Sequence, residues 1–129
     1  MRVIFVEDDA LNRRVVQDML SVIGVEMAEA EDAPTGLQML ARETYDLVLM
    51  DLRMPGMDGL TAIAHQRCAE TQSQIPIIVV TADTAPDLKD RCYAAGANDV
   101  IMKPVALNAL IDAIGRAVVG AADDDMMLD

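Results

Sequence analysis

The sequence predicts an α/β fold in which five parallel strands alternate with five helices, and two observations lead to this prediction. First, short apolar runs rich in β-branched residues recur along the chain, at 3–6, 47–50, 77–80 and 100–102. Such runs are typical of strands that are buried on both faces, as in parallel sheets. Second, the segments between these runs carry apolar residues at helical spacing. An alternation of strands and helices indicates a doubly wound sheet.

The first helix and the strand that follows it have clear local signals. Asp9 can cap a helix over about residues 10–23, and Gly24 suits the left-handed conformation at which a helix stops. One apolar stripe runs along this helix and consists of Val15, Val16, Met19, Leu20 and Ile23. A weaker strand is expected at 25–30.

The second and third helices lie on either side of the strand at 47–50. Asp32, with Pro34 in the first turn, begins a helix that reaches about residue 43. After the strand, a turn region containing proline and glycine leads to a third helix over about 60–70.

The last two helices flank the strand at 100–102. Thr84, followed by a proline and an acidic residue, is expected to cap a fourth helix that ends near Gly96. A fifth helix should end before Gly120. Its apolar stripe consists of Leu107, Leu110, Ile111, Ile114 and Val118.

These elements predict one domain over residues 1–119, followed by an acidic segment at 120–129 that we expect to be disordered. Right-handed crossovers and the flavodoxin-like strand order 2-1-3-4-5 place a switch point between the first and third strands. Ligands of such sheets bind beyond the carboxyl ends of the strands.

The composition narrows the range of partners. The formal net charge of −12 would repel nucleic acid. The two cysteines, Cys68 and Cys92, lie far apart without a metal-binding spacing, which is typical of a reduced cytoplasmic protein. No apolar run approaches the roughly 18 to 20 residues that a membrane span needs. We therefore expect a cytoplasmic protein with no nucleic acid and no membrane among its partners.

The predicted strands end at residues that can do chemistry. Glu7 and Asp8 follow the first strand, Asp51 the third, Thr81 the fourth and Lys103 the fifth. Three carboxylates in one crevice would repel one another unless a cation lay between them. A site built only from oxygen ligands favours Mg²⁺ over zinc.

The same crevice has the groups needed for phosphoryl transfer. Asp51 offers a carboxylate nucleophile, Lys103 a positive charge for a phosphoryl oxygen, and Thr81 a hydroxyl donor. The chain has no glycine-rich loop that would cradle a nucleotide. The phosphoryl group should therefore arrive on a donor protein or a small phosphodonor.

Four motifs together carry a family resemblance: Glu7-Asp8-Asp9, Asp51 with Arg53-Met54-Pro55-Gly56-Met57-Asp58-Gly59, Thr81-Ala82, and Lys103-Pro104. In this order, they resemble the receiver domain of two-component response regulators, of the single-domain kind that acts in chemotaxis. The resemblance covers residues 2 to about 119.

The resemblance implies a function and a set of site residues. A histidine kinase or a histidine phosphotransfer protein would phosphorylate Asp51, and the domain would then signal to a downstream protein target. Asp8 and Asp51 would bind Mg²⁺ through their side chains and Arg53 through its backbone carbonyl, while Glu7 would act through a metal-bound water. Thr81 and Lys103 would contact the phosphoryl group. The domain would assist its own phosphorylation and dephosphorylation but would not otherwise be an enzyme.

The resemblance also leads to expectations about individual residues. Lys103-Pro104 is a candidate cis bond. Val100 and Val105 stand where many receivers have aromatic residues, so we expect the loop from Ala82 through Pro86 to carry the output change. A partner kinase should recognise the first helix around Asn12, Arg13 and Val16. Arg53 and Asp83 are expected to pair across the mouth of the crevice.

Three alternatives remain open from the sequence. The chain is either a stand-alone response regulator, which Met1 and the acidic end favour, or a receiver fragment of a hybrid histidine kinase. An aspartyl-phosphate phosphatase would use Asp51 as its nucleophile, but Arg53 occupies the place of that family's second acid. A flavin-binding module would lack aromatic platforms, because the chain has no tryptophan. We interpret His65 as a solvated helix residue and not as a phosphohistidine site.

Overall fold

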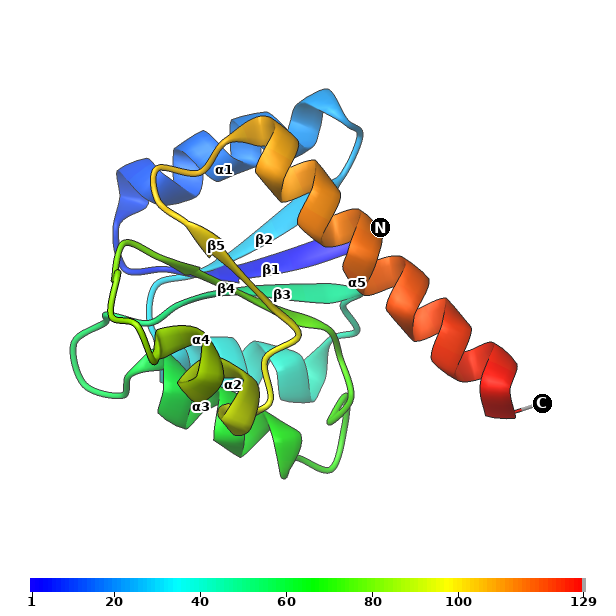
Figure 1. Ribbon diagram of the computed structural model, residues 1–129. Coiled ribbons are helices and arrows are strands. Elements are labelled where there is room, and N and C mark those ends of the chain that lie inside the picture. Colours follow the sequence, from blue (N-terminus) through cyan, green and yellow to red (C-terminus); the bar gives the residue numbers. More distant parts are fainter. Residues whose placement is uncertain (129) are drawn as a thin grey trace.

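The computed structural model describes residues 1–128 and contains one five-stranded parallel sheet in the order β2-β1-β3-β4-β5 (Figure 1). The predicted strand order is confirmed. The strands are β1 (Arg2–Val6), β2 (Glu26–Ala30), β3 (Leu47–Asp51), β4 (Ile77–Thr81) and β5 (Asp99–Met102). The helices are α1 (Ala10–Val22), α2 (Ala33–Arg42), α3 (Gly59–Arg67), α4 (Leu88–Ala95) and α5 (Leu107–Leu128).

The helices cover both faces of the sheet, with α1 above it and α2, α3 and α4 below it in Figure 1. Alternate side chains of each strand enter opposite cores. In β1, for example, Val3 and Phe5 pack with residues of α1 and α5, whereas Ile4 and Val6 pack with residues of α2, α3 and α4. Burial on both faces explains why the strands appear in the sequence as continuous apolar runs.

The predicted caps at the start of α1 and α2 are confirmed, and so is the predicted glycine stop of α1. The side chain of Asp9 accepts hydrogen bonds from the backbone N–H groups of Leu11 and Asn12 and so caps α1. Gly24, just after α1, has a φ of 74°, a left-handed conformation that favours glycine. The side chain of Asp32 caps α2 by accepting a hydrogen bond from the backbone of Thr35 at 2.8 Å.

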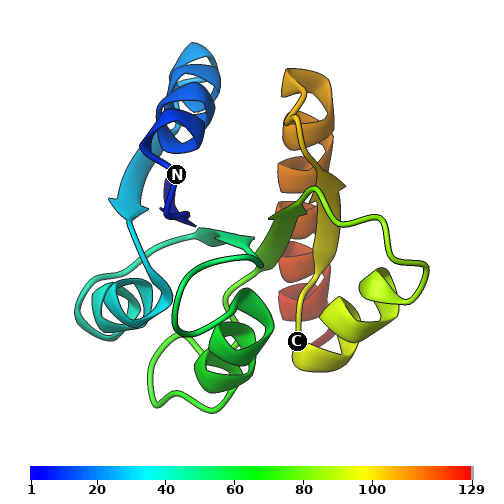
Figure 2. The same cartoon turned by 90° about the vertical axis from the view of Figure 1, so that its left-hand side faces the viewer.

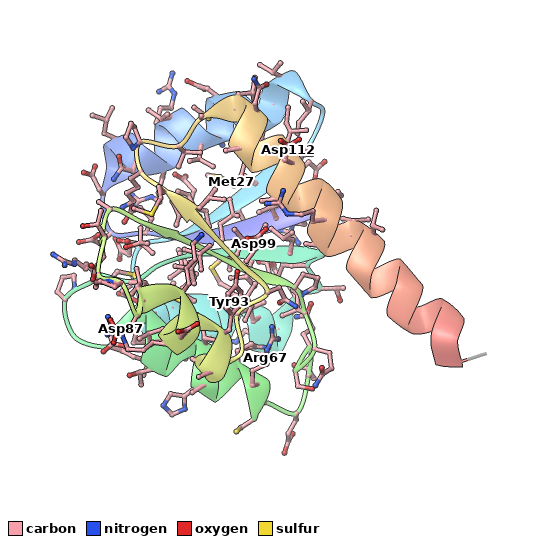
Figure 3. All side chains as sticks on the ribbon, in the orientation of Figure 1. Met27, Arg67, Asp87, Tyr93, Asp99 and Asp112 are labelled. Atoms are coloured by element: carbon pink, nitrogen blue, oxygen red, sulfur yellow. The ribbon has the colours of Figure 1, made fainter. Side chains whose placement is uncertain are left out.

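The predicted start of α4 is wrong, because the helix begins at Leu88 and Thr84 does not cap it. The carboxylate of Asp83 accepts a hydrogen bond from the backbone N–H of Ala85 at 2.9 Å. The carbonyl of Ala85 in turn accepts one from Leu88 at 3.1 Å. These bonds form a turn that competes with an earlier helix start. Asp87, at the left of Figure 3, is the N-cap residue but makes no capping bond through its side chain.

Helix α3 also differs from its prediction, since it ends at Arg67 and not near residue 70. The guanidinium of Arg67 donates hydrogen bonds to the carbonyls of Ser73 at 2.8 Å, Ile75 at 2.7 Å and Gly96 at 2.9 Å (Figure 3). The chain after α3 turns back around this side chain and cannot continue as a helix.

Helix α5 runs past its predicted end at Gly120 and reaches Leu128, and its last turns extend beyond the sheet (Figure 1). The sequence after Gly120 contains alanine, methionine and leucine, which favour helix, together with aspartates, which favour it less. The disorder expected for 120–129 stays a prediction, and residue 129 lies outside the described residues. The division into a domain and a separate acidic segment stays a prediction.

The predicted apolar stripe of α5 is only partly buried. Leu110 and Ile114 lie in the core together with Ala113, which the sequence prediction left out. Ile111 and Val118 are exposed instead. Within the part of the chain that the structure describes, no helix is both long and apolar enough to cross a membrane.

Candidate functional site

The predicted site residues all lie at the carboxyl edge of the sheet. Asp51 and Thr81 are the last residues of β3 and β4, and Glu7 and Lys103 directly follow β1 and β5. The parallel strands bring these ends together, and the loops that leave them gather at the left of Figure 1 and face the viewer in Figure 2. Asp8 follows Glu7 in the first of these loops.

Lys103 connects two of the acids. Its ammonium nitrogen Nζ donates hydrogen bonds to Glu7 Oε1 at 2.7 Å and to Asp51 Oδ1 at 3.3 Å. The side chains of Glu7 and Asp51 are nearly buried, with exposed fractions of 1% and 6%. Because both pairs are partly shielded from water, the Coulomb attraction between their charges is stronger than in ion pairs on the surface. The structure therefore holds the carboxylate of Asp51 beside a positive charge.

Glu7, Asp8 and Asp51 form an acidic cluster in which one carboxylate oxygen of each lies within 4.8 Å of the others. Among residues 1–128, Glu7 Oε2 is a buried side-chain oxygen without a hydrogen-bond partner. An unpartnered buried carboxylate oxygen is costly unless a cation or a water bound to one satisfies it. The cluster therefore fits a hard divalent cation such as Mg²⁺.

The electrostatics of the crevice shift two pKa values. Burial, together with the neighbouring carboxylate of Asp51, raises the pKa of Glu7. Burial alone would lower the pKa of Lys103, but the hydrogen bond to Glu7 and the charge of Asp51 outweigh it and raise that pKa. Lys103 therefore stays positively charged in the crevice.

Thr81 is buried, with an exposed fraction of 1%, and its hydroxyl oxygen accepts a hydrogen bond from the backbone N–H of Asp83 at 3.1 Å. Asp83 also pairs with Arg53, in the loop after β3, at 3.3 Å between Nη2 and Oδ2. The predicted meeting of these two side chains is confirmed. The peptide bond between Lys103 and Pro104 is cis, as the sequence suggested.

The start of α1 borders the crevice. Asn12 Nδ2 donates a hydrogen bond to Glu7 Oε1 at 2.9 Å, and Arg13 Nη1 donates one to the carbonyl of Glu7 at 2.6 Å. From the sequence, Asn12 was predicted only as a contact for a partner protein, and its bond to Glu7 was not predicted. A polar residue in the first turn of a helix, five positions after a strand-end acid, is a signal that could have indicated this contact.

A small apolar hollow of about 170 Å³ lies between α1 and the segment after β5. Its lining residues are Phe5, Asn12, Val15, Val16, Val80, Lys103, Pro104 and Val105. The hollow thus shares Lys103 with the crevice. His65 lies in the last turn of α3 and is exposed, and within the described chain it belongs to no acidic or metal-binding cluster.

Comparisons with known proteins agree with this geometry. The family model described as the response regulator receiver domain matches residues 3–115. The sensor histidine kinase AruS of Pseudomonas aeruginosa is 36% identical to the chain, and the alignment covers 100% of the chain but 14% of AruS. The chain thus spans about one seventh of the length of this relative.

Two solved structures are similar to the whole fold. The receiver domain of the sensor histidine kinase PA1611 from Pseudomonas aeruginosa is 31% identical, with a TM-score of 0.83 and coverage of 91% of this chain and 96% of that one. That structure has a magnesium ion coordinated in its active-site cleft. The chemotaxis protein CheY4 of Vibrio cholerae is 27% identical, with a TM-score of 0.84 and coverage of 90% and 97%.

Proposed function

The chain belongs to the response regulator receiver domain family, and we propose that Asp51 is the residue that accepts the phosphoryl group. The observation that supports Asp51 most strongly is the pair of contacts that Lys103 makes to Glu7 and Asp51 at the end of the sheet. Asp51 is thus the nearly buried acid that lies at a strand end beside both a fixed positive charge and two other carboxylates.

The proposed transfer needs little from the protein beyond placement and charge. A carboxylate oxygen of Asp51 attacks phosphorus, and the bond between phosphorus and the donor's histidine nitrogen breaks. The released imidazole takes up a proton. The positive charge of Lys103 offsets the negative charge that the phosphoryl group brings to Asp51. Phosphoryl transfer is governed mainly by such positioning and charge neutralisation.

Receiver domains bind Mg²⁺ in this crevice, and in our proposal Asp8 and Asp51 would hold the ion by their side chains. Glu7 would hold it through a bound water, and Arg53 through its backbone carbonyl. The ion would neutralise charge on the phosphoryl oxygens. The unpartnered Glu7 Oε2 supports this assignment, because a metal-bound water would satisfy it.

Thr81 and Lys103 would report the phosphorylated state. The Thr81 hydroxyl lies at the end of β4 and accepts a bond from the loop that leads to α4. If the hydroxyl turns toward the phosphoryl group, this loop must adjust. We propose that the adjusted loop is what a downstream protein target recognises. The domain would then signal by conformation and would not turn over an external substrate.

A histidine kinase or a phosphotransfer protein is the proposed phosphodonor, and it would dock on α1 beside the crevice. The exposed side chains of Leu11 and Val15 and the apolar hollow offer it a surface next to Lys103. Similarity to sensor kinases such as AruS also fits a receiver that belongs to a hybrid kinase. Both forms use the same site chemistry.

The proposal is tested by incubating the protein with acetyl phosphate, with and without Mg²⁺, and measuring its intact mass. We expect one added phosphoryl group that requires Mg²⁺ and is missing in Asp51→Asn, because asparagine keeps the shape but lacks the nucleophile. Asp58→Asn is a matched control. Asp58 caps α3, and asparagine caps a helix equally well. Labelling that persists in Asp51→Asn would contradict the proposal.

A further inference from the structure

Two donors bind the same oxygen of Glu7. Lys103 Nζ and Asn12 Nδ2 both donate to Oε1, at 2.7 Å and 2.9 Å, while Oε2 is buried without a partner among residues 1–128. A carboxylate normally distributes its donors over both oxygens, since each has two acceptor sites. The arrangement around Glu7 is therefore one-sided, and it leaves one charged oxygen free beside Asp8 and Asp51.

We propose that Asn12 is a positioning residue for the cation site: by holding Oε1 of Glu7 together with Lys103, it keeps Oε2 available to the shell of a divalent cation. This inference rests on the function proposed above and concerns a residue that does not itself touch the cation. It assigns the side chain of Asn12 a role within the crevice, in addition to any contact with a partner protein.

The local structure explains how Asn12 can act in this way. Its backbone lies in the first turn of α1, which the side chain of Asp9 caps, so the amide group starts from a fixed point. Its short side chain loses little freedom when it binds. Glu7 has a longer side chain and lies close to Asp51, whose like charge favours rotation away from the cluster. Two donors on one oxygen restrict that rotation.

Lys103 cannot perform this task alone. It is shared between Glu7 and Asp51, and in the proposed phosphorylated state it also contacts the phosphoryl group. Each new contact weakens its hold on Glu7. The amide of Asn12 has Glu7 as its hydrogen-bond acceptor in the described chain, so it remains in place while Lys103 changes partners. Partners that orient a ligand in this way commonly affect metal affinity.

The test is the affinity for Mg²⁺ alone, measured by isothermal titration calorimetry on the full chain. We expect Asn12→Ala to raise the dissociation constant by up to about 10-fold, the low end of the loss seen when a residue that orients a metal ligand is removed, because Glu7 reaches the cation through a water. Gln17→Ala is the matched control, because it removes an amide from an exposed position of the same helix. It should leave the dissociation constant unchanged. Circular dichroism establishes that each variant is folded.

A second comparison separates positioning from a general effect on α1. The Glu7→Ala variant has no carboxylate to position. Adding Asn12→Ala to it should therefore not raise the dissociation constant for Mg²⁺ further. If Glu7→Ala does not fold, Glu7→Gln serves the same purpose, because it too lacks a charged oxygen.

Two results would overturn the inference: an Asn12→Ala dissociation constant equal to that of Gln17→Ala, or an effect of Asn12→Ala that persists in full without the Glu7 carboxylate. Failure of the wild-type protein to bind Mg²⁺ or to accept a phosphoryl group would instead contradict the proposed function itself.

Discussion

At the residue scale, the crevice depends on a balance between one ammonium group and several carboxylates. Lys103 is held between Glu7 and Asp51, and removing it would leave two nearly buried acids without a positive partner. An unpaired buried charge is strongly destabilising. The same contacts that suit Lys103 to a phosphoryl group therefore also stabilise the end of the sheet.

The pair formed by Arg53 and Asp83 leads to a prediction about the lifetime of the phosphorylated state. The two side chains meet at 3.3 Å across the crevice mouth, where they would obstruct an attacking water. We expect Arg53→Ala and Asp83→Ala each to speed dephosphorylation by a few-fold, since an exposed pair opens readily and can slow water only modestly. The decay of phosphorylated protein, followed by mass spectrometry, measures this rate.

The control for this prediction is Arg14→Ala, which breaks the exposed pair between Arg14 and Asp18 on α1, away from the crevice mouth. Its dephosphorylation rate should match that of the wild type. Equal phosphoryl lifetimes in all three variants would mean that the pair between Arg53 and Asp83 does not limit access of water.

At the element scale, the position of Asp51 depends on how closely α3 approaches the end of β3. Gly59, the first residue of α3, donates its backbone N–H to the carbonyl of Leu52 at 3.0 Å. A Cβ atom at this position would meet the backbone carbonyl oxygen of Asp51 and the Cα of Leu52. Glycine is therefore required here by close packing beside the site.

We predict that Gly59→Ala destabilises the fold by about 1 to 3 kcal/mol, the usual cost of overpacking, because backbone atoms cannot move aside easily. Chemical denaturation measures the free energy of unfolding. Gly115→Ala is the matched control. Gly115 lies within α5 with open space around its Cα, so alanine should raise the free energy of unfolding by about 0.5 to 1 kcal/mol. Equal effects of the two substitutions would contradict the role of Gly59.

The loop between β4 and α4 is the element expected to move on phosphorylation. Val100 is buried in the core between the sheet and helices α2, α3 and α4, so this position of β5 has an aliphatic side chain and not an aromatic ring that could turn inward. Hydrogen bonds instead connect Thr81 to Asp83, Asp83 to Ala85, and Ala85 to the first residue of α4. A change at the Thr81 hydroxyl can therefore reach α4 through this loop.

We predict that beryllofluoride, a phosphoryl mimic, shifts the NMR signals of 82–90 more than those of β5. Amide chemical shifts recorded with and without beryllofluoride measure the change. Spectra of Asp51→Asn, which should not bind the mimic, provide the control. Unchanged signals for 82–90, together with large shifts along the outer face of β5, would contradict the proposal that this loop carries the conformational change.

At the scale of the whole molecule, the sequence was enough to predict the sheet and most of the site. Continuous apolar runs appear only where strands are buried on both faces, and parallel topology then places Glu7, Asp51, Thr81 and Lys103 at one edge. These residues are adjacent because of the strand order alone.

Features that depend on competing local hydrogen bonds or on packing could not be predicted in this way. The late start of α4 follows from the side chain of Asp83, which binds the backbone of Ala85 instead of leaving Thr84 to cap a helix. The burial of Ala113 in place of Ile111 depends on how α5 is rotated against the sheet. The bond between Asn12 and Glu7 depends on where α1 begins relative to β1.

Direct identification of the modified residue is the best test of whether Asp51 receives the phosphoryl group. The protein would be phosphorylated with acetyl phosphate and Mg²⁺, the acyl phosphate reduced with borohydride, and the peptides sequenced by mass spectrometry. We expect reduction to convert Asp51, and no other acid, to homoserine. Conversion of Glu7, Asp8 or another carboxylate while Asp51 stays intact would contradict it.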